Sequence, residues 1–125
     1  MVQSLNTAAD LVMAGTSFHR INTYGQIMIG DKGFEFYNAQ CAEDYIQIPW
    51  GEIDYVIASV LFCGKYIPRF AIQTKKSGTF SFAARQPKAL LRAMRPYVET
   101  GHMVRSLGLM DVLKRSLIAG RKKII

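Results

Sequence analysis

Residues 70–98 read FAIQTKKSGTFSFAARQPKALLRAMRPYV, and they contain the change of pattern that decides the fold. Up to Ala84, apolar and polar residues alternate as they do in strands, and Gly78 predicts a hairpin turn because glycine tolerates a positive φ. From Pro87 onward, apolar residues recur at helical spacing, and proline suits the first turn of a helix. The stretch therefore predicts a β-hairpin followed by an amphipathic helix, 87–98, that covers a sheet.

Basic residues accompany this helix outside its apolar stripe. Pro96 is expected to bend or end the helix, and Gly101 marks a break after it. A second apolar stripe between Leu109 and Leu117 predicts a short second helix that Gly120 ends. The basic residues that lie largely off the first stripe are Arg85, Lys88, Arg92 and Arg95.

The alternation of apolar and polar residues also runs through the first two thirds of the chain and predicts about seven short strands. The connections are mostly tight turns, which are too short for parallel crossovers, so we expect antiparallel pairing. Pro49 has no N–H to donate and predicts a strand end or an edge, whereas 53–62 is nearly all apolar and is expected to be central. The predicted strands are 11–20, 26–29, 34–37, 45–50, 53–62, 70–74 and 79–84.

An antiparallel sheet of this size must curl or split to protect its edges, and a terminal helix can close one open end. This order resembles that of PH/GRAM-like barrels, and the strand-Trp-acid-Ile pattern of 46–53 and the hairpin of 69–82 resemble GRAM motifs. We therefore expect a mainly β (α+β) fold. Residues 1–98 are expected to form a PH/GRAM-like antiparallel barrel with its capping helix, and 99–125 a basic helical extension that is not an independent domain.

Several segments together resemble a small bacterial family of undetermined function, sometimes called ManO. The resemblance implies an accessory or regulatory protein encoded beside mannose-type sugar phosphotransferase components, and it carries over no catalytic residue. The segments are MVQSLNT (1–7), GTSFH (15–19), IMIGDK (27–32), FEFYN (34–38), 44–50, 52–58, 68–76 and MVRSL (103–107).

The formal net charge of +7 comes from the last third of the chain. Residues 85–125 contain ten basic and two acidic residues, a net charge of +8, whereas residues 1–84 have a net charge of −1. This asymmetry favours an acidic partner, which could be nucleic acid, an anionic membrane surface or another protein. A solvated basic helix that only aids solubility is the alternative.

Few residues of the sequence suggest catalysis or metal binding. His19 could accept a phosphoryl group, but no neighbour in sequence supports this over an ordinary strand histidine, and His102 is expected to be a solvated loop residue. Cys41 and Cys63 form no CxxC pair, and the cysteines and histidines lack metal-ligand spacing. Neither GxGxxG nor GxxxxGK[ST] occurs. We therefore expect no enzyme activity, no cofactor and no metal.

The sequence thus predicts a cytoplasmic, non-enzymatic accessory or regulatory interaction module, and the resemblance links it to mannose-type phosphotransferase transport. The longest charge-free stretches, 21–30 and 55–64, have ten residues each, about half of a membrane-spanning helix. The expected partner is a phosphotransferase component or the anionic inner membrane face, and the sequence leaves open whether the chain forms a homo-oligomer. The alternative function is a DNA-binding regulator of the transport operon. The residues expected to steer docking are Lys114, Arg115, Arg121, Lys122 and Lys123.

Overall fold

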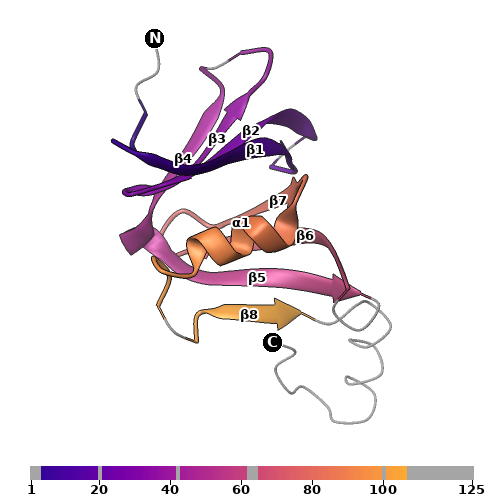
Figure 1. Cartoon of the computed structure of the whole chain (residues 1–125). Helices are drawn as coiled ribbons and strands as arrows, with labels where there is room; N and C mark the ends of the chain where they lie inside the picture. Colours follow the sequence, from indigo (N-terminus) through magenta and orange to yellow (C-terminus); the bar gives the residue numbers. More distant parts are fainter. Residues whose placement is uncertain (1–3, 20, 42, 62–64, 100, 107–125) are drawn as a thin grey trace, which may run out of the picture.

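Eight strands form one continuous sheet in the computed structural model, with a single short helix among the described residues (Figure 1). The structure describes residues 4–19, 21–41, 43–61, 65–99 and 101–106. The strands are β1 (Ala9–Ser17), β2 (Thr23–Gly30), β3 (Gly33–Asn38), β4 (Tyr45–Pro49), β5 (Ile53–Leu61), β6 (Tyr66–Thr74), β7 (Thr79–Ala84) and β8 (Met103–Ser106). The helix is α1 (Pro87–Met94), and a single 3-10 turn, η1 (Trp50–Glu52), joins β4 to β5.

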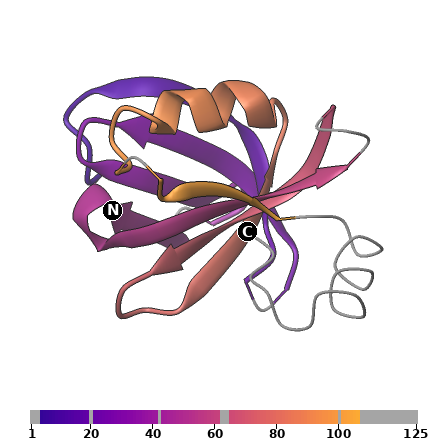
Figure 2. The ribbon, with the colours of Figure 1, turned by 90° about the horizontal axis from the view of Figure 1, so that it is seen from below.

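The prediction of a mainly β fold is confirmed, but the sheet is mixed and does not close into a barrel, so the expected antiparallel barrel is wrong. The strand order is β4-β3-β2-β1-β7-β6-β5-β8, and all neighbours are antiparallel except β5 and β8, which are parallel. Within the described residues, β4 and β8 are the two edges. The sheet curls, so that β1–β4 and β5–β7 lie as two layers around a shared interior (Figures 1 and 2).

All seven predicted strands exist; β7 has the predicted bounds and the other six have shifted ends. β2 begins at Thr23, three residues before the predicted start at residue 26. β4 ends at Pro49 and is an edge, which confirms both readings of that proline. β6 begins at Tyr66 and includes Pro68. Its register with β5 shifts around this proline, between the pair Ser59–Arg69 and the pair Leu61–Tyr66. β5 pairs with β6 on one side and with β8 on the other, so it is an interior strand as expected, one place from the edge of the sheet.

The strand β8 was not foreseen. It lies in the segment expected to be a helical extension and begins two residues after Gly101, whose φ of +88° suits glycine. Met103 pairs with Val56 and Arg105 with Ala58, while the Val56 N–H donates to the His102 carbonyl over 2.8 Å. Parallel strands need a long connection, and β6, β7 and α1, which lie between β5 and β8 in the sequence, supply it. The predicted second helix, 109–117, lies outside the described residues.

The helix α1 lies across the opening between the two layers (Figures 1 and 2). Pro87 occupies its first turn, as predicted, and the helix ends at Met94, two residues before Pro96, which agrees with the expected effect of this proline and makes the helix shorter than 87–98. Leu90 and Met94, one turn apart, are fully buried and point into the core. The helix therefore closes the core through one face only.

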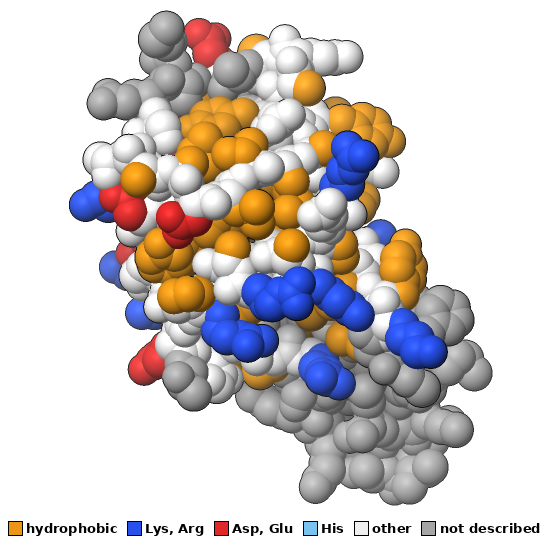
Figure 3. Space-filling view, in the orientation of Figure 1, with side chains coloured by type: hydrophobic (Ala, Val, Ile, Leu, Met, Phe, Trp, Pro, Cys, Tyr) orange, Lys and Arg blue, Asp and Glu red, His pale blue; other side chains and the backbone are white. Residues whose placement is uncertain are grey.

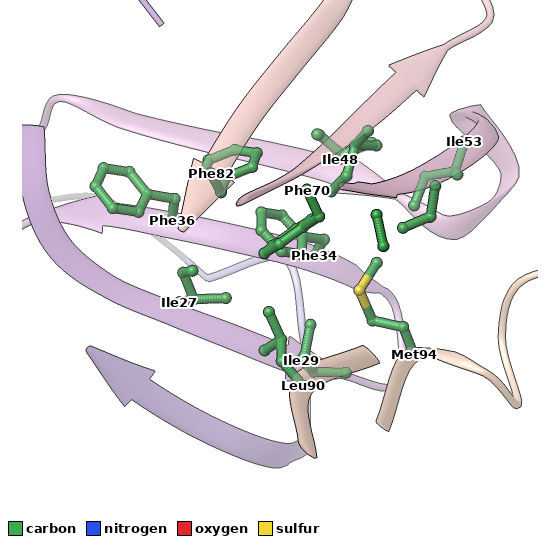
Figure 4. Packing of buried hydrophobic residues seen from close by; sticks show 13 residues of the cluster. Ile27, Ile29, Phe34, Phe36, Ile48, Ile53, Phe70, Phe82, Leu90 and Met94 are labelled. Carbon is green, nitrogen blue, oxygen red and sulfur yellow. The ribbon is translucent and has the colours of Figure 1, made fainter. Parts of the chain in front are cut away.

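The core is built from both layers and α1 (Figure 4). Phe34 from the first layer packs on Phe82 from the second with ring centroids 4.8 Å apart, and Phe70 lies 5.8 Å from Phe82. Ile27 and Ile29 share a buried face, as the alternation in the sequence predicted. The buried apolar residues are Ile27, Ile29, Phe34, Phe36, Ile48, Ile53, Val56, Ala58, Phe70, Ile72, Phe82, Leu90 and Met94.

Glu35 is fully buried although it points away from this core, because the segment 4–8 crosses over it. Burial raises the pKa of its carboxyl, but the hydrogen bonds from Tyr37, Leu5 N, Ser4 and Asn6 together outweigh burial and hold the pKa below its ordinary value. Its donors are Ser4 Oγ (2.7 Å), Leu5 N (3.0 Å), Asn6 Nδ2 (2.5 Å), Gln47 Nε2 (3.1 Å) and the Tyr37 hydroxyl.

Asp31 fastens the next part of the same segment. Its carboxylate accepts hydrogen bonds from the Thr7 hydroxyl and from the backbone N–H groups of Thr7 and Ala8, and these bonds lower its pKa to about 2. Asn6 Oδ1 accepts from Lys32 N over 2.7 Å and from Gly33 N over 2.8 Å. The segment 4–8 is therefore fixed to the β2–β3 turn by ionised carboxylates and an amide.

Replacing Glu35 is expected to destabilise the fold. In Glu35→Ala the Leu5 N–H and the Ser4, Asn6 and Tyr37 donors lose a charged acceptor, which we expect to lower the free energy of unfolding by about 2–3 kcal/mol. Glu52→Ala, at an exposed carboxylate, is the control and is expected to change it by less than about 0.5 kcal/mol. Urea denaturation measures both, and equal effects would contradict the role of Glu35.

Stability is also expected to depend on pH through these two carboxylates. Their pKa values are lower in the folded chain than in the unfolded chain, so their stabilisation is complete above about pH 5 and is lost as the pH falls toward 2. The double variant Glu35→Gln/Asp31→Asn should flatten this part of the curve of unfolding free energy against pH. A curve as steep as that of the unchanged protein would contradict the assignment.

Candidate functional site

A groove runs along one side of α1, between this helix and the strands β5 and β8, and has a volume of about 390 Å³. Basic side chains gather over the helix on this face of the molecule (Figure 3). We call this feature the basic groove. Its basic residues are Lys88 and Arg92 from α1, Arg95 at the C-cap of this helix and Arg105 from β8; its apolar residues are Val56, Ala58, Val60, Ile67, Leu91, Met103 and Val104.

The floor of the groove is one face of two neighbouring strands. Val56, Ala58 and Val60 alternate along β5 and therefore point to the same side of the sheet. The parallel register places Met103 beside Val56 and Arg105 beside Ala58 on that side. One apolar strip, with a cation at its edge, is thus formed from residues almost fifty positions apart in the sequence.

The strip is open because of where α1 lies. The helix has eight residues, buries Leu90 and Met94, and packs mainly on β1, β2, β6 and β7. The groove faces of β5 and β8 lie beside the helix and not beneath it, and Leu91 forms the helical wall. The helical layer over this sheet is therefore incomplete among the described residues.

The electrostatic character of the groove is uniform. None of the described residues that line it is acidic, and the side chains of Lys88, Arg92, Arg95 and Arg105 form no ion pair with any described residue. Lys88 and Arg92 lie four positions apart on α1, and Arg92 and Arg95 three apart, where like charges destabilise an isolated helix by about 0.2–0.5 kcal/mol per pair. Arg92 lies in the last turn of α1 and Arg95 is its C-cap, where a positive charge interacts favourably with the helix dipole, so the two opposing effects leave these cations with little net influence on the helix.

A second hollow of about 590 Å³ continues the basic surface toward the start of β6. It shares Lys88 and Arg92 with the basic groove and adds Lys65 and Arg85. The positive surface therefore extends along the whole outer side of α1.

The structure describes only half of the ten basic residues in the last third of the chain. The five predicted to steer docking, Lys114, Arg115, Arg121, Lys122 and Lys123, lie outside the described residues. The other five, Arg85, Lys88, Arg92, Arg95 and Arg105, line the two hollows. Helical spacing had placed the four before residue 100 off the apolar stripe. Arg105 joins them only through the parallel pairing of β8, which left no signal in the sequence.

His19 lines a different cleft, of about 520 Å³, between β4 and the β6–β7 hairpin. Its ring packs on Phe80 with centroids 4.8 Å apart. Asp44 and Glu52 line the same cleft, but among the described residues neither forms a hydrogen bond or ion pair with the His19 ring. The described geometry therefore gives His19 no acid–base partner.

The other singled-out residues are placed as follows. His102 is not a simply solvated residue: its ring stacks on Tyr55 at 4.5 Å, its Nδ1 lies 2.5 Å from the Asp54 carbonyl oxygen and its Nε2 3.5 Å from Glu99. Cys41 is exposed, and Cys63 lies outside the described residues. In the described part of the chain, no three metal-ligating side chains gather. None of the helices described there has the length and apolarity needed to cross a membrane.

Solved structures share the fold. One is the crystal structure of the C-terminal domain of an unknown protein from Leishmania infantum, which is 14% identical to this chain and matches with a TM-score of 0.61 over 74% of this chain and 85% of that chain. At such low identity the likeness concerns the fold alone. No curated protein matches the sequence. Residues 1–117 match the model of a family described as a domain of unknown function (DUF956).

The cations of the groove are expected to be dispensable for folding. Arg92→Gln/Arg95→Gln removes two unpaired charges from α1 and keeps good helix formers, so the free energy of unfolding should stay within about 0.5 kcal/mol of the unchanged protein. Urea denaturation measures it, and Lys75→Gln/Lys76→Gln in the exposed β6–β7 turn is the charge-matched control. A loss above about 1.5 kcal/mol in the α1 variant alone would show that these arginines are structural.

Proposed function

The chain belongs to the DUF956 family, and we propose that it acts as a non-enzymatic interaction module that docks an acidic protein through the basic groove. One observation carries the proposal: four cations without an ion-pair partner among the described residues surround an apolar strip that contains no acidic residue. Surfaces of this kind attract partners of opposite charge and fix their orientation. Apolar contact in the groove then adds affinity.

The proposed partner is a component of mannose-type sugar phosphotransferase transport, in an accessory or regulatory role at the cytoplasmic side of the membrane. Support for this comes from the resemblance of the sequence segments to the ManO family. The basic residues 114, 115 and 121–123 would extend the positive field around the groove and speed the encounter with an acidic surface.

We also propose a relation to PH/GRAM-like domains. The support is the order of β1–β7, all antiparallel and followed by a helix, together with the position of Trp50 at the end of β4. Trp50 stacks on Tyr97 at 4.8 Å and donates from Nε1 to the Gly30 carbonyl over 2.9 Å, which ties the β2–β3 turn to the chain after α1. The open sheet and β8 are departures from a closed barrel.

The apolar floor favours a protein over DNA or a lipid surface. Phosphate backbones are bound mainly by cations and polar groups, and bases are read by polar side chains or aromatic stacking. The half-buried side chains of Val60, Leu91 and Met103 can neither bind phosphates nor read bases, but they can pack against apolar side chains of a protein. DNA and anionic membranes are therefore the alternatives that an experiment must separate.

Affinity capture from the native host with the full chain tests the proposal. Arg92→Gln/Arg95→Gln should weaken capture of an acidic partner by about 1–2 kcal/mol, roughly 5- to 30-fold, because each rim cation contributes up to about 1 kcal/mol. Lys75→Gln/Lys76→Gln has the same net charge and should capture normally. Added salt should weaken binding of the unchanged protein.

Two results would contradict a protein partner. In a mobility-shift assay across a salt series, a preference for promoter DNA that is lost in the α1 variant would favour the DNA-binding regulator. Co-sedimentation with anionic vesicles that is lost in the same variant, without any captured protein, would favour a membrane surface.

A further inference from the structure

We propose that the occupant of the basic groove is an acidic amphipathic helix of the partner, which lies beside α1 on the open strip of β5 and β8. This inference rests on the proposed function and gives its partner a defined shape. It follows from the form of the groove, its apolar residues, the placement of its charges and the charge of the chain's own C-terminal segment.

The form of the groove fits a helix. Its floor is the face of two adjacent strands, and one wall is the side of α1 that carries Leu91. Sheets in two-layer folds are covered by helices packed side by side. Because α1 packs on β1, β2, β6 and β7 and leaves β5 and β8 beside it, a second helix in the groove would complete this layer.

The fold buries the apolar residues of the groove only in part. Val60, Ile67, Leu91 and Met103 pack against the edge of the core but stay half-buried, whereas Val56 and Ala58 beneath them are buried. An occupant with apolar residues at positions i, i+3, i+4 and i+7 would bury the remaining surface.

The charges lie on both sides of this strip. Lys88, Arg92 and Arg95 belong to the helical wall, and Arg105 belongs to the opposite, β8 side. An amphipathic helix presents one apolar stripe flanked on both sides by polar residues, so carboxylates on its flanks would meet cations on each side. A phosphate backbone offers the charge without the apolar stripe.

The chain's own C-terminal segment does not have the matching charge. Residues 107–125 contain the five basic residues Lys114, Arg115, Arg121, Lys122 and Lys123 against the single acid Asp111, which gives a net side-chain charge of +4. Placing this segment between four unpaired cations would bring like charges together. The complementary helix therefore comes from a partner.

Two synthetic peptides of about 18 residues, made of Leu, Glu and Ala, test the inference against the full chain. In one, leucines form a single helical stripe flanked by glutamates; in the other, the same residues are shuffled so that the stripe is lost. Fluorescence anisotropy of the labelled peptides should show at least about 10-fold tighter binding of the striped peptide.

Variants of the protein test which of its residues contact the peptides. Arg92→Gln/Arg95→Gln should weaken binding of both peptides roughly 5- to 30-fold, and Lys75→Gln/Lys76→Gln should leave it unchanged. Met103→Gln, a change at a half-buried edge residue, should weaken only the striped peptide, by roughly 5-fold. Circular dichroism melts of each variant verify that it is folded.

The outcomes separate the inference from the function on which it rests. Equal binding of the two peptides, lost in the α1 variant, would overturn the helical occupant and leave an acidic partner. Binding of neither peptide, or equal effects of the α1 and hairpin-turn variants, would overturn both. A striped peptide that binds more tightly but is unaffected by Met103→Gln would overturn the placement on the β5–β8 strip.

Discussion

The pairing of β1 with β7 is the contact on which the rest of the molecule depends. Three residue pairs, Gly15 with Ala84 through Ser17 with Phe82, join the N-terminal meander to the C-terminal hairpin. A Cβ on Gly15 would lie 2.9 Å from the Ala83 carbonyl oxygen, so only glycine allows this approach. The junction makes two antiparallel units one curled sheet, and it places the opening that α1 covers.

The position of the groove follows from this curl. Because α1 begins three residues after β7, its start is fixed at the junction, and the helix is too short to cover more than one part of the second layer. The chain then returns to add β8 beside β5, which brings Arg105 to the strip across from α1. The basic residues of the last third of the sequence are thus gathered around one groove, which is positively charged.

Local patterns in the sequence predicted most of the fold. Alternation at Phe34 and Phe36, and the change of pattern at Pro87, were enough for the seven strands and the helix, because both reflect the local burial period. β8 and the open sheet were missed, since four residues carry little periodicity and parallel pairing is a long-range choice. Alternation with Phe34 and Phe36 puts Glu35 on the opposite face of β3, but its burial depends on the segment 4–8, which has no strand pattern.

The most direct test of the central claim is amide chemical-shift mapping of the full chain during titration with the striped acidic peptide. The account predicts that the shifted amides concentrate along α1, in β8 and at positions 56–60 of β5. Shifts centred on the cleft of His19 and Phe80, or spread evenly over the basic surface, would contradict a binding site in the groove beside α1.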